Sequence, residues 1–323
     1  MFKNLINNLK QQNIIIIFPD GDDIRVLTAC SKLANQEILT PVVLGDKIKI
    51  EKLAKENKLD ISKIEFVDIN NYPEKEAMVE LMLELRKGKM TEEEVRKSLE
   101  KGNYFGTMIV KIGYAHGLLG GATYSTADTV RPALQLIKTK PGTKIVSSSF
   151  VLVRKRKQKE EKYIFADCAI NLHPNEDDLV EIAIQSAETA RVFGIDPKVA
   201  MLSYSTFGSG KGEDVDAVRN ATQKLKYRKL DFDVDGELQF DAAFSSSTAK
   251  IKAPNSSVAG HANIFVFPDI NSGNIGYKIA QRLGDFEALG PILQGLNAPI
   301  NDLSRGCSEE DVFKMAIITA NQK

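Results

Sequence analysis

The chain lacks several features that would identify a function class directly. It has no tryptophan, three cysteines and three histidines in 323 residues. The cysteines are far apart and form no Cys-x-x-Cys pair, which argues against both a disulfide framework and a structural zinc site. The histidines lie in separate segments without a second histidine at ligand spacing. We therefore expect no metal site and assign the histidines to packing or to the surface.

The chain also has no excess of charge of either sign. Lysine and arginine together number 43, and aspartate and glutamate together also number 43. This balance removes any global electrostatic attraction to nucleic acid or to an anionic membrane. The apolar run Ile14–Phe18 is far too short to span a bilayer. We expect a cytoplasmic protein that binds neither nucleic acid nor membrane.

Short apolar runs alternate with amphipathic segments, which predicts an α/β protein with parallel strands. At 323 residues the chain exceeds what one core usually serves, so two domains are expected. Strands are predicted at residues 13–19, 41–44, 64–68, 143–153, 163–169, 199–205, 240–244 and 264–268. Helices are predicted from about residue 24, where acidic residues cap it, and at 47–58, 73–87, 176–193, 213–227 and 272–283. If the C-terminal helix completes the first sheet, residues 1–142 plus 296–323 form one domain and residues 143–295 an inserted second domain.

The segment Ser304-Arg305-Gly306-Cys307 leads into a predicted helix. Apolar residues recur at helical spacing from Val312 onward, and Ser308-x-x-Asp311 is a capping-box signature. A hydroxyl, a guanidinium and a carboxylate at a helix entry can handle both an anion and a proton. The alternative is that Ser308 and Asp311 only cap the helix.

Cys307 stands beside Arg305 and the helix start, so we expect its thiol pKa to be lowered. A covalent acyl-cysteine mechanism is therefore the rival to a purely steric role for this side chain.

A second segment rich in glycine and hydroxyl groups runs from Gly120 to Pro132. Its paired glycines allow a ligand to approach the backbone, Ser125 and Thr126 lie at a predicted helix start, and Arg131 follows about two turns later. The alternative is that Ser125 is only a cap and Arg131 a surface residue. Two arginine-bearing helix entries in a chain of balanced charge favour an anion site.

Two further segments are interpreted as surface structure. Residues 208–212 contain a Gly-Lys pair, but Ser205 stands where a P-loop requires its first glycine, and Gly212 stands where it requires serine or threonine. We interpret this segment as a surface turn. The charged run Arg154–Lys162 is interpreted as a solvated hairpin connection that protects a sheet edge.

Several longer motifs resemble phosphate acetyltransferases of the short, single-unit kind. The resembling segments are Ser125–Gln135, Lys140–Gly142, Ser147–Phe150, Phe165–Asp167, Phe267–Lys278, Gly290–Gly295 and Pro299–Gly306. The resemblance implies two α/β domains similar to those of isocitrate and isopropylmalate dehydrogenases, an active site in the interdomain cleft, and a homodimer. It also implies reversible conversion of acetyl-CoA and orthophosphate to acetyl phosphate and CoA, with CoA as a substrate and no tightly bound cofactor.

The resemblance further assigns roles by motif position. Ser304 would hydrogen-bond the CoA thiol, Asp311 would accept its proton, and Arg305 would steady the phosphate or the acyl oxygen. The substrate-binding residues implied are Arg131, Arg86, Ser125, Thr126, Tyr277 and Lys278, with Cys307 as a non-nucleophilic neighbour. A thiol of pKa about 8.5 is only a few per cent ionised at neutral pH, so a nearby base removes a penalty of roughly 2 kcal/mol. Arginine forks match the tetrahedral oxyanion and the departing phosphate.

Three rival functions stay open at this point. A phosphate butyryltransferase performs the same chemistry on a longer acyl chain. A non-catalytic acyl-CoA-sensing module is the rival of another class, because related domains are found fused to malic enzymes; the presence of Ser304, Arg305 and Asp311 argues against it. A dehydrogenase fits the fold alone, but its metal-binding aspartates and nicotinamide loop are not evident.

Overall fold

The computed structural model describes residues 1–10, 12–157 and 159–323, and the chain forms two compact units. Unit 1 comprises Met1–Pro141 and Leu296–Lys323, and unit 2 comprises Gly142–Gly295. Unit 2 is therefore inserted between two separate parts of unit 1. No helix in the described ranges is long and apolar enough to cross a membrane.

Unit 1 is built on a parallel five-stranded sheet in the order β11-β4-β1-β2-β3. Its strands are β1 (Ile15–Phe18), β2 (Thr40–Leu44), β3 (Glu65–Val67), β4 (Gly117–Gly120) and β11 (Ile300–Asp302). β11 pairs with β4, with Ile300 opposite Leu118. The segment that follows unit 2 in sequence thus completes the first sheet.

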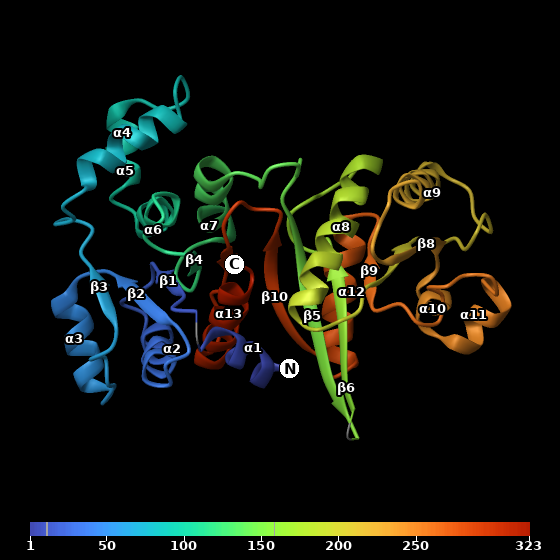
Figure 1. Cartoon of the computed structure of the whole chain (residues 1–323), viewed down its shortest axis with the longest axis horizontal. Coiled ribbons are helices and arrows are strands. Elements are labelled where there is room, and N and C mark those ends of the chain that lie inside the picture. Colours follow the sequence, from blue (N-terminus) through green and yellow to red (C-terminus); the bar gives the residue numbers. More distant parts are fainter. Residues whose placement is uncertain (11, 158) are drawn as a thin grey trace. The chain divides into compact units, whose positions relative to one another are not determined.

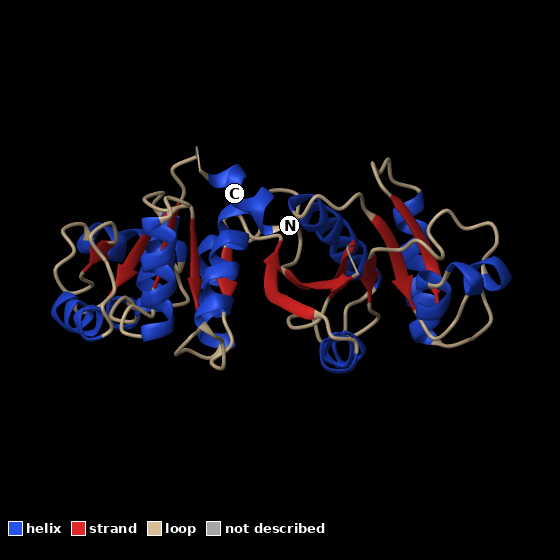
Figure 2. Cartoon of the chain, turned by 90° about the horizontal axis from the view of Figure 1, so that it is seen from below, coloured by secondary structure: helices blue, strands red, loops and turns tan. Residues whose placement is uncertain are grey.

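Helices cover both faces of this sheet (Figure 2). The helices of unit 1 are α1 (Phe2–Leu9), α2 (Ile24–Asn35), α3 (Lys47–Glu56), α4 (Lys75–Leu85), α5 (Glu92–Ser98), α6 (Gly102–Lys111), α7 (Thr126–Pro132), the π-helix η1 (Ala133–Ile137) and α13 (Glu309–Asn321). Of these, α4 packs against α5 and η1. Figure 1 shows α2 and α13 packed together on one face, with α6 and α7 on the other. Because both faces are covered, β1 is a continuous apolar run in which Ile16, Ile17 and Phe18 are fully buried.

Unit 2 has a mixed six-stranded sheet in the order β10-β5-β6-β9-β7-β8. Its strands are β5 (Ser147–Arg156), β6 (Lys159–Ala166), β7 (Lys198–Leu202), β8 (Asp233–Leu238), β9 (Ile264–Val266) and β10 (Glu287–Gln294). Its helices are α8 (Glu176–Val192), α9 (Glu213–Lys226), α10 (Phe240–Phe244), α11 (Ser246–Lys252) and α12 (Ile270–Leu283). β10, β5 and β6 pair antiparallel, and β6, β9, β7 and β8 pair parallel.

One predicted element of unit 2 is wrong. The sequence predicts a strand at residues 240–244, whereas the structure has helix α10 there and places the strand earlier, in β8. Phe240 and Phe244 stand four positions apart, and their rings stack with centroids 5.6 Å apart. Ala242 and Ala243 face the core and are fully buried. The segment has only five residues, four of them apolar, which is too few to distinguish the helical period from the strand period, and its packing favours the helix.

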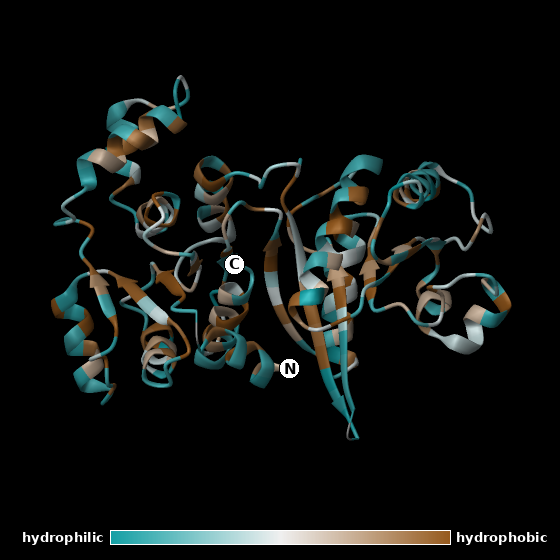
Figure 3. Cartoon of the chain, in the orientation of Figure 1, coloured by the Kyte–Doolittle hydropathy of each residue, from teal (hydrophilic) through white to brown (hydrophobic). Residues whose placement is uncertain are grey.

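The charged run in unit 2 forms the end of a hairpin, as predicted. β5 and β6 pair antiparallel through it, with Arg154 opposite Glu161. The Arg154 guanidinium donates to Glu161 Oε2 at 2.9 Å from Nε and 2.6 Å from Nη2. Figure 3 shows the tip in the hydrophilic colour, and residues 155–157 are exposed. Gln158, within the predicted run, lies outside the described residues.

Candidate active site

Three neighbouring strands of unit 1 end at one edge of the sheet, and half of the candidate residues follow them. Asp20 follows β1, Gly121–Thr126 follow β4, and Leu303–Cys307 follow β11. Since the three strands are adjacent and parallel, their carboxyl ends meet at this edge, where open α/β sheets bind ligands. The Leu303 N–H donates to the Gly120 carbonyl at 2.7 Å, so pairing continues to the first residue of the segment after β11.

Asp311 caps helix α13, as the capping interpretation predicted. The N–H and the hydroxyl of Ser308 each donate to Asp311 Oδ2 at 2.8 Å, and the Asp311 N–H donates to Ser308 Oγ at 3.2 Å. Within the described residues, Asp311 Oδ1 accepts no hydrogen bond. The cap therefore occupies one carboxylate oxygen and leaves the other for chemistry. Ser304 and Arg305 lie just before this helix and are exposed.

Arg25 at the start of α2 ties the site segments together, and the sequence analysis missed it. Its Nη1 donates to the carbonyl oxygens of Arg305 and Cys307, each at 2.8 Å, and its Nη2 donates to that of Ala122 at 3.1 Å. Asp23 caps α2 by accepting from the Arg25 N–H at 2.9 Å, which confirms the predicted cap, and also holds the guanidinium at 2.6 Å. Arg25 thus joins the segment after β11 to the segment after β4.

Two buried carboxyl groups at this edge were also missed. Asp20 accepts from the N–H groups of Gly121 at 3.0 Å and Thr123 at 2.9 Å, while burial raises its pKa. Burial also raises the pKa of Asp302 to about 6, against the lowering effect of the Thr126 hydroxyl. Gly121 has φ +105°, and a Cβ there would collide with the Asp302 carboxylate, so this position requires glycine.

The predicted lowering of the Cys307 pKa is wrong. The side chain is only 7% exposed, and burial raises its thiol pKa. The cation that counteracts burial is Arg25, while the nearby carboxylates Asp23 and Asp311 add to the rise. A thiol held in its neutral form is a poor nucleophile, so its environment favours the steric role over the acyl-cysteine route.

The charges of the predicted anion-binding arginines act on one tyrosine of unit 1. Burial raises the pKa of Tyr104, and the positive charges of Arg131 and Arg86 both counteract that rise. Tyr104 itself donates to Gln135 Oε1 at 2.9 Å. Across the described ranges neither arginine forms an ion pair, and Arg86 Nε is buried without an acceptor.. Arg86 is half-buried and Arg131 is exposed. Guanidinium groups without a carboxylate partner can bind an anionic ligand.

Ser125 is the N-cap of α7, which confirms its capping interpretation. It accepts from the Asp128 N–H at 3.3 Å and donates to Asp128 Oδ2 at 2.6 Å. Tyr277 and Lys278 belong to α12 in unit 2, where the Tyr277 ring stacks on Phe150 with centroids 3.9 Å apart. Substrate binding by these residues stays a prediction. The described residues contain no group of three His, Cys, Asp or Glu side chains able to hold a metal ion.

Two glycine amides of the Gly208–Gly212 turn are hydrogen-bonded within the protein. The Gly208 N–H donates to Glu237 Oε1 at 2.7 Å, and the Gly210 N–H donates to Ser205 Oγ at 2.9 Å. This agrees with the rejection of a nucleotide loop. His116 Nδ1 accepts from the Ile15 N–H at 3.0 Å, which is the packing role predicted for it.

Comparison with known proteins decides the family. The family model described as "Phosphate acetyl/butaryl transferase" matches residues 1–320. The chain belongs to this family. The phosphate acetyltransferase of Bacillus subtilis (strain 168) is 52% identical over 322 residues, which cover 100% of this chain and 98% of that protein.

Solved structures named as phosphotransacetylases share the fold over almost the whole chain. A phosphotransacetylase from Streptococcus pyogenes aligns with a TM-score of 0.95 and 53% identity, covering 99% of this chain and 97% of that one. EutD phosphotransacetylase from Staphylococcus aureus aligns with a TM-score of 0.90 and 51% identity, covering 99% and 98%. The predicted family and α/β fold class are confirmed, and the chain is an acyltransferase of this family.

Proposed function

We propose that this chain transfers an acetyl group reversibly between CoA and orthophosphate, forming acetyl phosphate, by direct thiolate attack in a ternary complex. Relatives at 52% and 51% identity carry the name phosphate acetyltransferase, which supports the reaction. The observation that supports this mechanism most is that the two carboxylate oxygens of Asp311 differ in their contacts. Oδ2 accepts both hydrogen bonds of the helix cap, while Oδ1 has no partner among the described residues. A residue can therefore cap α13 and act as a base at once.

The proton and the acyl group are handled by the residues around α13. Ser304 donates to or accepts from the CoA thiol and orients it, and Asp311 Oδ1 takes its proton. The thiolate attacks the carbonyl carbon of acetyl phosphate, an oxyanion forms, and phosphate leaves as the thioester carbonyl re-forms. Arg305 steadies the oxyanion or the phosphate, because a charge-assisted fork is strongest where negative charge develops.

The remaining substrate contacts are assigned to two further groups. Arg131 and Arg86, with Ser125 and Thr126, hold the phosphate or CoA end. Tyr277 and Lys278 of unit 2 complete the set. No cofactor is needed, because CoA itself is a substrate. A cytoplasmic location fits the three cysteines, all of which are free and buried.

The proposed reaction is tested by following thioester formation from CoA with acetyl phosphate and, separately, with butyryl phosphate. We expect CoA-dependent turnover with a higher kcat/KM for acetyl phosphate. A preference for butyryl phosphate would make the chain a butyryltransferase. Absence of turnover with both donors would favour the alternative function, a non-catalytic module that senses acyl-CoA.

Cys307→Ala is expected to retain substantial activity, because the reacting thiol belongs to CoA and Asp311 remains to deprotonate it. Initial-rate plots with both substrates varied should intersect, as they do for a ternary complex. Parallel double-reciprocal lines, or trapping of an acetylated Cys307 from acetyl phosphate without CoA, would show that the cysteine is the nucleophile.

We also propose that two copies associate through an apolar face of unit 2, the α12 face. It comprises the side chains of Phe240, Phe244, Ile275, Ile279 and Leu283, which are between 43% and 82% exposed. Three of them stand four positions apart on α12 and form one stripe. Exposed apolar side chains that lie together often mark a protein–protein interaction site.

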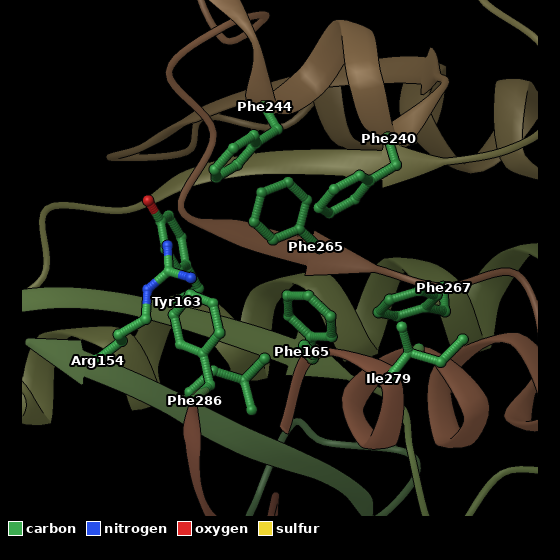
Figure 4. A pocket seen from close by; sticks show the side chains of 12 residues that line it. Arg154, Tyr163, Phe165, Phe240, Phe244, Phe265, Phe267, Ile279 and Phe286 are labelled. Atoms are coloured by element: carbon green, nitrogen blue, oxygen red, sulfur yellow. The ribbon is translucent and has the colours of Figure 1, made fainter. Parts of the chain in front are cut away.

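A cavity of about 420 Å³ opens beside this stripe, lined by Phe165, Phe265 and Phe286 among others. Figure 4 shows Phe240 and Phe244 on one side of it and Ile279 of α12 on another. Arg154 is the charged residue in the lining, and its guanidinium lies 4.1 Å from the Phe286 ring centroid while bonded to Glu161. The cavity thus suits an apolar side chain from a second copy.

Leu283→Glu is expected to convert the dimer to a monomer, because the carboxylate would be buried without a partner in the proposed interface. Light scattering coupled to size exclusion gives the mass. The matched control is Ile48→Glu, a substitution at a side chain that is 79% exposed on α3 in unit 1. A wild-type monomer, or a dimer unaffected by Leu283→Glu, would contradict this assignment.

A further inference from the structure

Arg25 uses every N–H of its guanidinium in hydrogen bonds to the protein. Its Nε donates to Asp23 Oδ1 at 3.0 Å, and its Nη2 donates to Asp23 Oδ2 at 2.6 Å. Nη1 donates to the carbonyl oxygens of Arg305 and Cys307, each at 2.8 Å, and Nη2 also donates to that of Ala122 at 3.1 Å. A guanidinium has one N–H at Nε and two at each Nη, so all of them are used.

These bonds distinguish Arg25 from Arg131 and Arg86, to which the proposed function assigns the phosphate or CoA end. The Arg25 charge is already paired with the Asp23 carboxylate, and the two side chains are 29% and 12% exposed. An arginine binds a phosphate through N–H groups that point at its oxygens. Since every donor of Arg25 is used and its charge is paired, Arg25 is suited to holding the protein and not to binding a substrate.

The backbone that Arg25 holds after β11 is a tight turn. The Cys307 N–H donates to the Ser304 carbonyl oxygen at 2.9 Å, and the Gly306 N–H donates to Ser304 Oγ at 3.2 Å. Neither of these bonds uses the two carbonyl groups that accept from Arg25. Because both of those carbonyl groups must point at the same nitrogen, Arg25 fixes the orientation of the turn. The backbone atoms that carry the Ser304 and Arg305 side chains are fixed with it.

Arg25 is itself anchored to the fold on two sides. It is the second residue of α2, and Asp23, the N-cap of that helix, accepts from the Arg25 N–H at 2.9 Å. Asp23 therefore caps α2 and orients the guanidinium at once. The bond to Ala122 reaches the segment after β4. One side chain thus fixes the turn after β11 relative to both α2 and β4.

We propose that Arg25 is a positioning residue, which holds the Ser304–Cys307 turn so that the Ser304 hydroxyl and the Arg305 guanidinium meet the reacting atoms. This rests on the proposed function, which assigns Ser304 and Arg305 to the reaction. Orientation has a large effect on rate, because a misplacement of about 1 Å can lower it about 100-fold. Asp23 contributes to the same role, since its two oxygens fix the plane of the guanidinium.

Arg25→Lys is expected to lower kcat about 100-fold while the Kd of CoA stays close to that of the wild type. An ammonium group keeps the charge, but it lacks the planar fork that bonds one carboxylate and three carbonyl groups together. Steady-state rates with acetyl phosphate and CoA give kcat, and titration calorimetry gives the Kd of CoA. A weakened Kd or a raised KM with an unchanged kcat would make Arg25 a substrate-binding residue and overturn the positioning role.

Arg25→Ala allows a rescue experiment. The substitution leaves a space between Asp23 and the carbonyl groups of the turn, which a free guanidinium ion fits. Guanidinium at millimolar concentration should raise the kcat of this variant about tenfold, the scale of one charge-assisted hydrogen bond. Methylammonium at the same concentration controls for charge and ionic strength and should give no such rise. If guanidinium does not raise the kcat of a folded Arg25→Ala, the loss does not come from these contacts and the role is overturned.

Lys32→Ala is the matched control on the same helix. Lys32 Nζ lies 2.5 Å from Glu309 Oε1, so this exposed ion pair also joins α2 to α13, but it ends on the first residue of α13 instead of on the turn. Its loss should leave kcat close to wild type, with or without guanidinium, since exposed pairs contribute little. A fall in kcat equal to that of Arg25→Lys would show that any loosening of α2 has this effect, which overturns the specific role of Arg25.

Asp23→Asn decides the question if thermal unfolding shows that the Arg25 variants do not fold. Asparagine caps a helix as well as aspartate does, so α2 keeps its N-cap. The guanidinium loses its charged partner, and kcat should fall about tenfold. If the Arg25 variants fold, adding Asp23→Asn to Arg25→Lys should lower kcat no further. If they do not fold, a wild-type kcat in Asp23→Asn overturns the role.

The outcomes separate this proposal from the proposed function. If the wild-type chain turns over acetyl phosphate and both folded Arg25 variants match its kcat, the role of Arg25 is overturned and the reaction stands. If the wild-type chain turns over neither acetyl phosphate nor butyryl phosphate, the reaction is overturned, and the role of Arg25 in it is overturned as well.

Discussion

Replacement of Asp311 by asparagine is expected to lower kcat about 100-fold or more, the usual loss when a general base is removed. The asparagine carboxamide oxygen can accept the two Ser308 bonds that now end on Oδ2. The position of Oδ1 then carries an amide nitrogen, which cannot take the proton of the CoA thiol. Helix α13 keeps its cap while the reaction loses its base. Steady-state rates from acetyl phosphate and CoA give the effect.

Ser308→Ala is the matched control for that variant. It removes the hydroxyl of the capping box, which donates to Asp311 and accepts from its N–H, but leaves the carboxylate in place. The midpoint of thermal unfolding should fall by a few degrees while kcat stays close to wild type. If Asp311→Asn instead keeps wild-type turnover and only unfolds more easily, Asp311 is a cap and nothing more.

Arg305→Lys and Arg131→Lys are each expected to lower kcat/KM for acetyl phosphate by roughly 10- to 150-fold. Lysine keeps the positive charge but loses the planar fork, so about 1.5–3 kcal/mol of transition-state stabilisation is lost, the scale of one hydrogen bond to a charged group. No carboxylate partners either guanidinium in the described ranges, so the loss should appear in catalysis and hardly in stability.

Arg96→Lys provides the control for a conservative change at a surface ion pair. The Arg96 guanidinium bonds Glu76 and Glu92 on the outside of unit 1. This substitution should leave kcat/KM unchanged, since exposed pairs contribute little. Unchanged kcat/KM in both Arg305→Lys and Arg131→Lys would remove the two arginines from the site.

The sheets could be predicted from sequence where the pattern was long or repeated. β1 and β2 of unit 1 are buried on both faces and read as apolar runs, and the β5–β6 hairpin is framed by its charged tip. β11 has only three residues, too few to show a period, yet it is the strand that carries the site segment. The error at residues 240–244 has the same origin, because a short apolar run fits helix and strand alike.

The candidate site could be predicted only where its contacts are local. Ser308 and Asp311 are three residues apart, and the cap is visible in the sequence. Arg25 donates a hydrogen bond to the carbonyl oxygen of Arg305, which lies 280 residues later in the sequence, and no local sequence pattern predicts such a contact. The prediction of a lowered Cys307 pKa was wrong for a related reason. Arg305, close to it in sequence, suggested a low thiol pKa, but burial of the side chain in the fold outweighs the effect of a nearby cation.

Because the C-terminal segment Leu296–Lys323 completes the first sheet, unit 1 can be completed only at the end of synthesis. The ribosome completes all of unit 2 before it makes Leu296–Lys323, and until then β4 is an edge strand with an unpaired side. Unit 2 is contiguous and can fold first, whereas unit 1 must wait. A polypeptide stalled or cleaved inside unit 2 lacks Ser304, Arg305 and Asp311 altogether. The residues that we propose to carry the reaction are therefore made only after the second unit, and on this proposal incomplete products cannot consume acetyl-CoA.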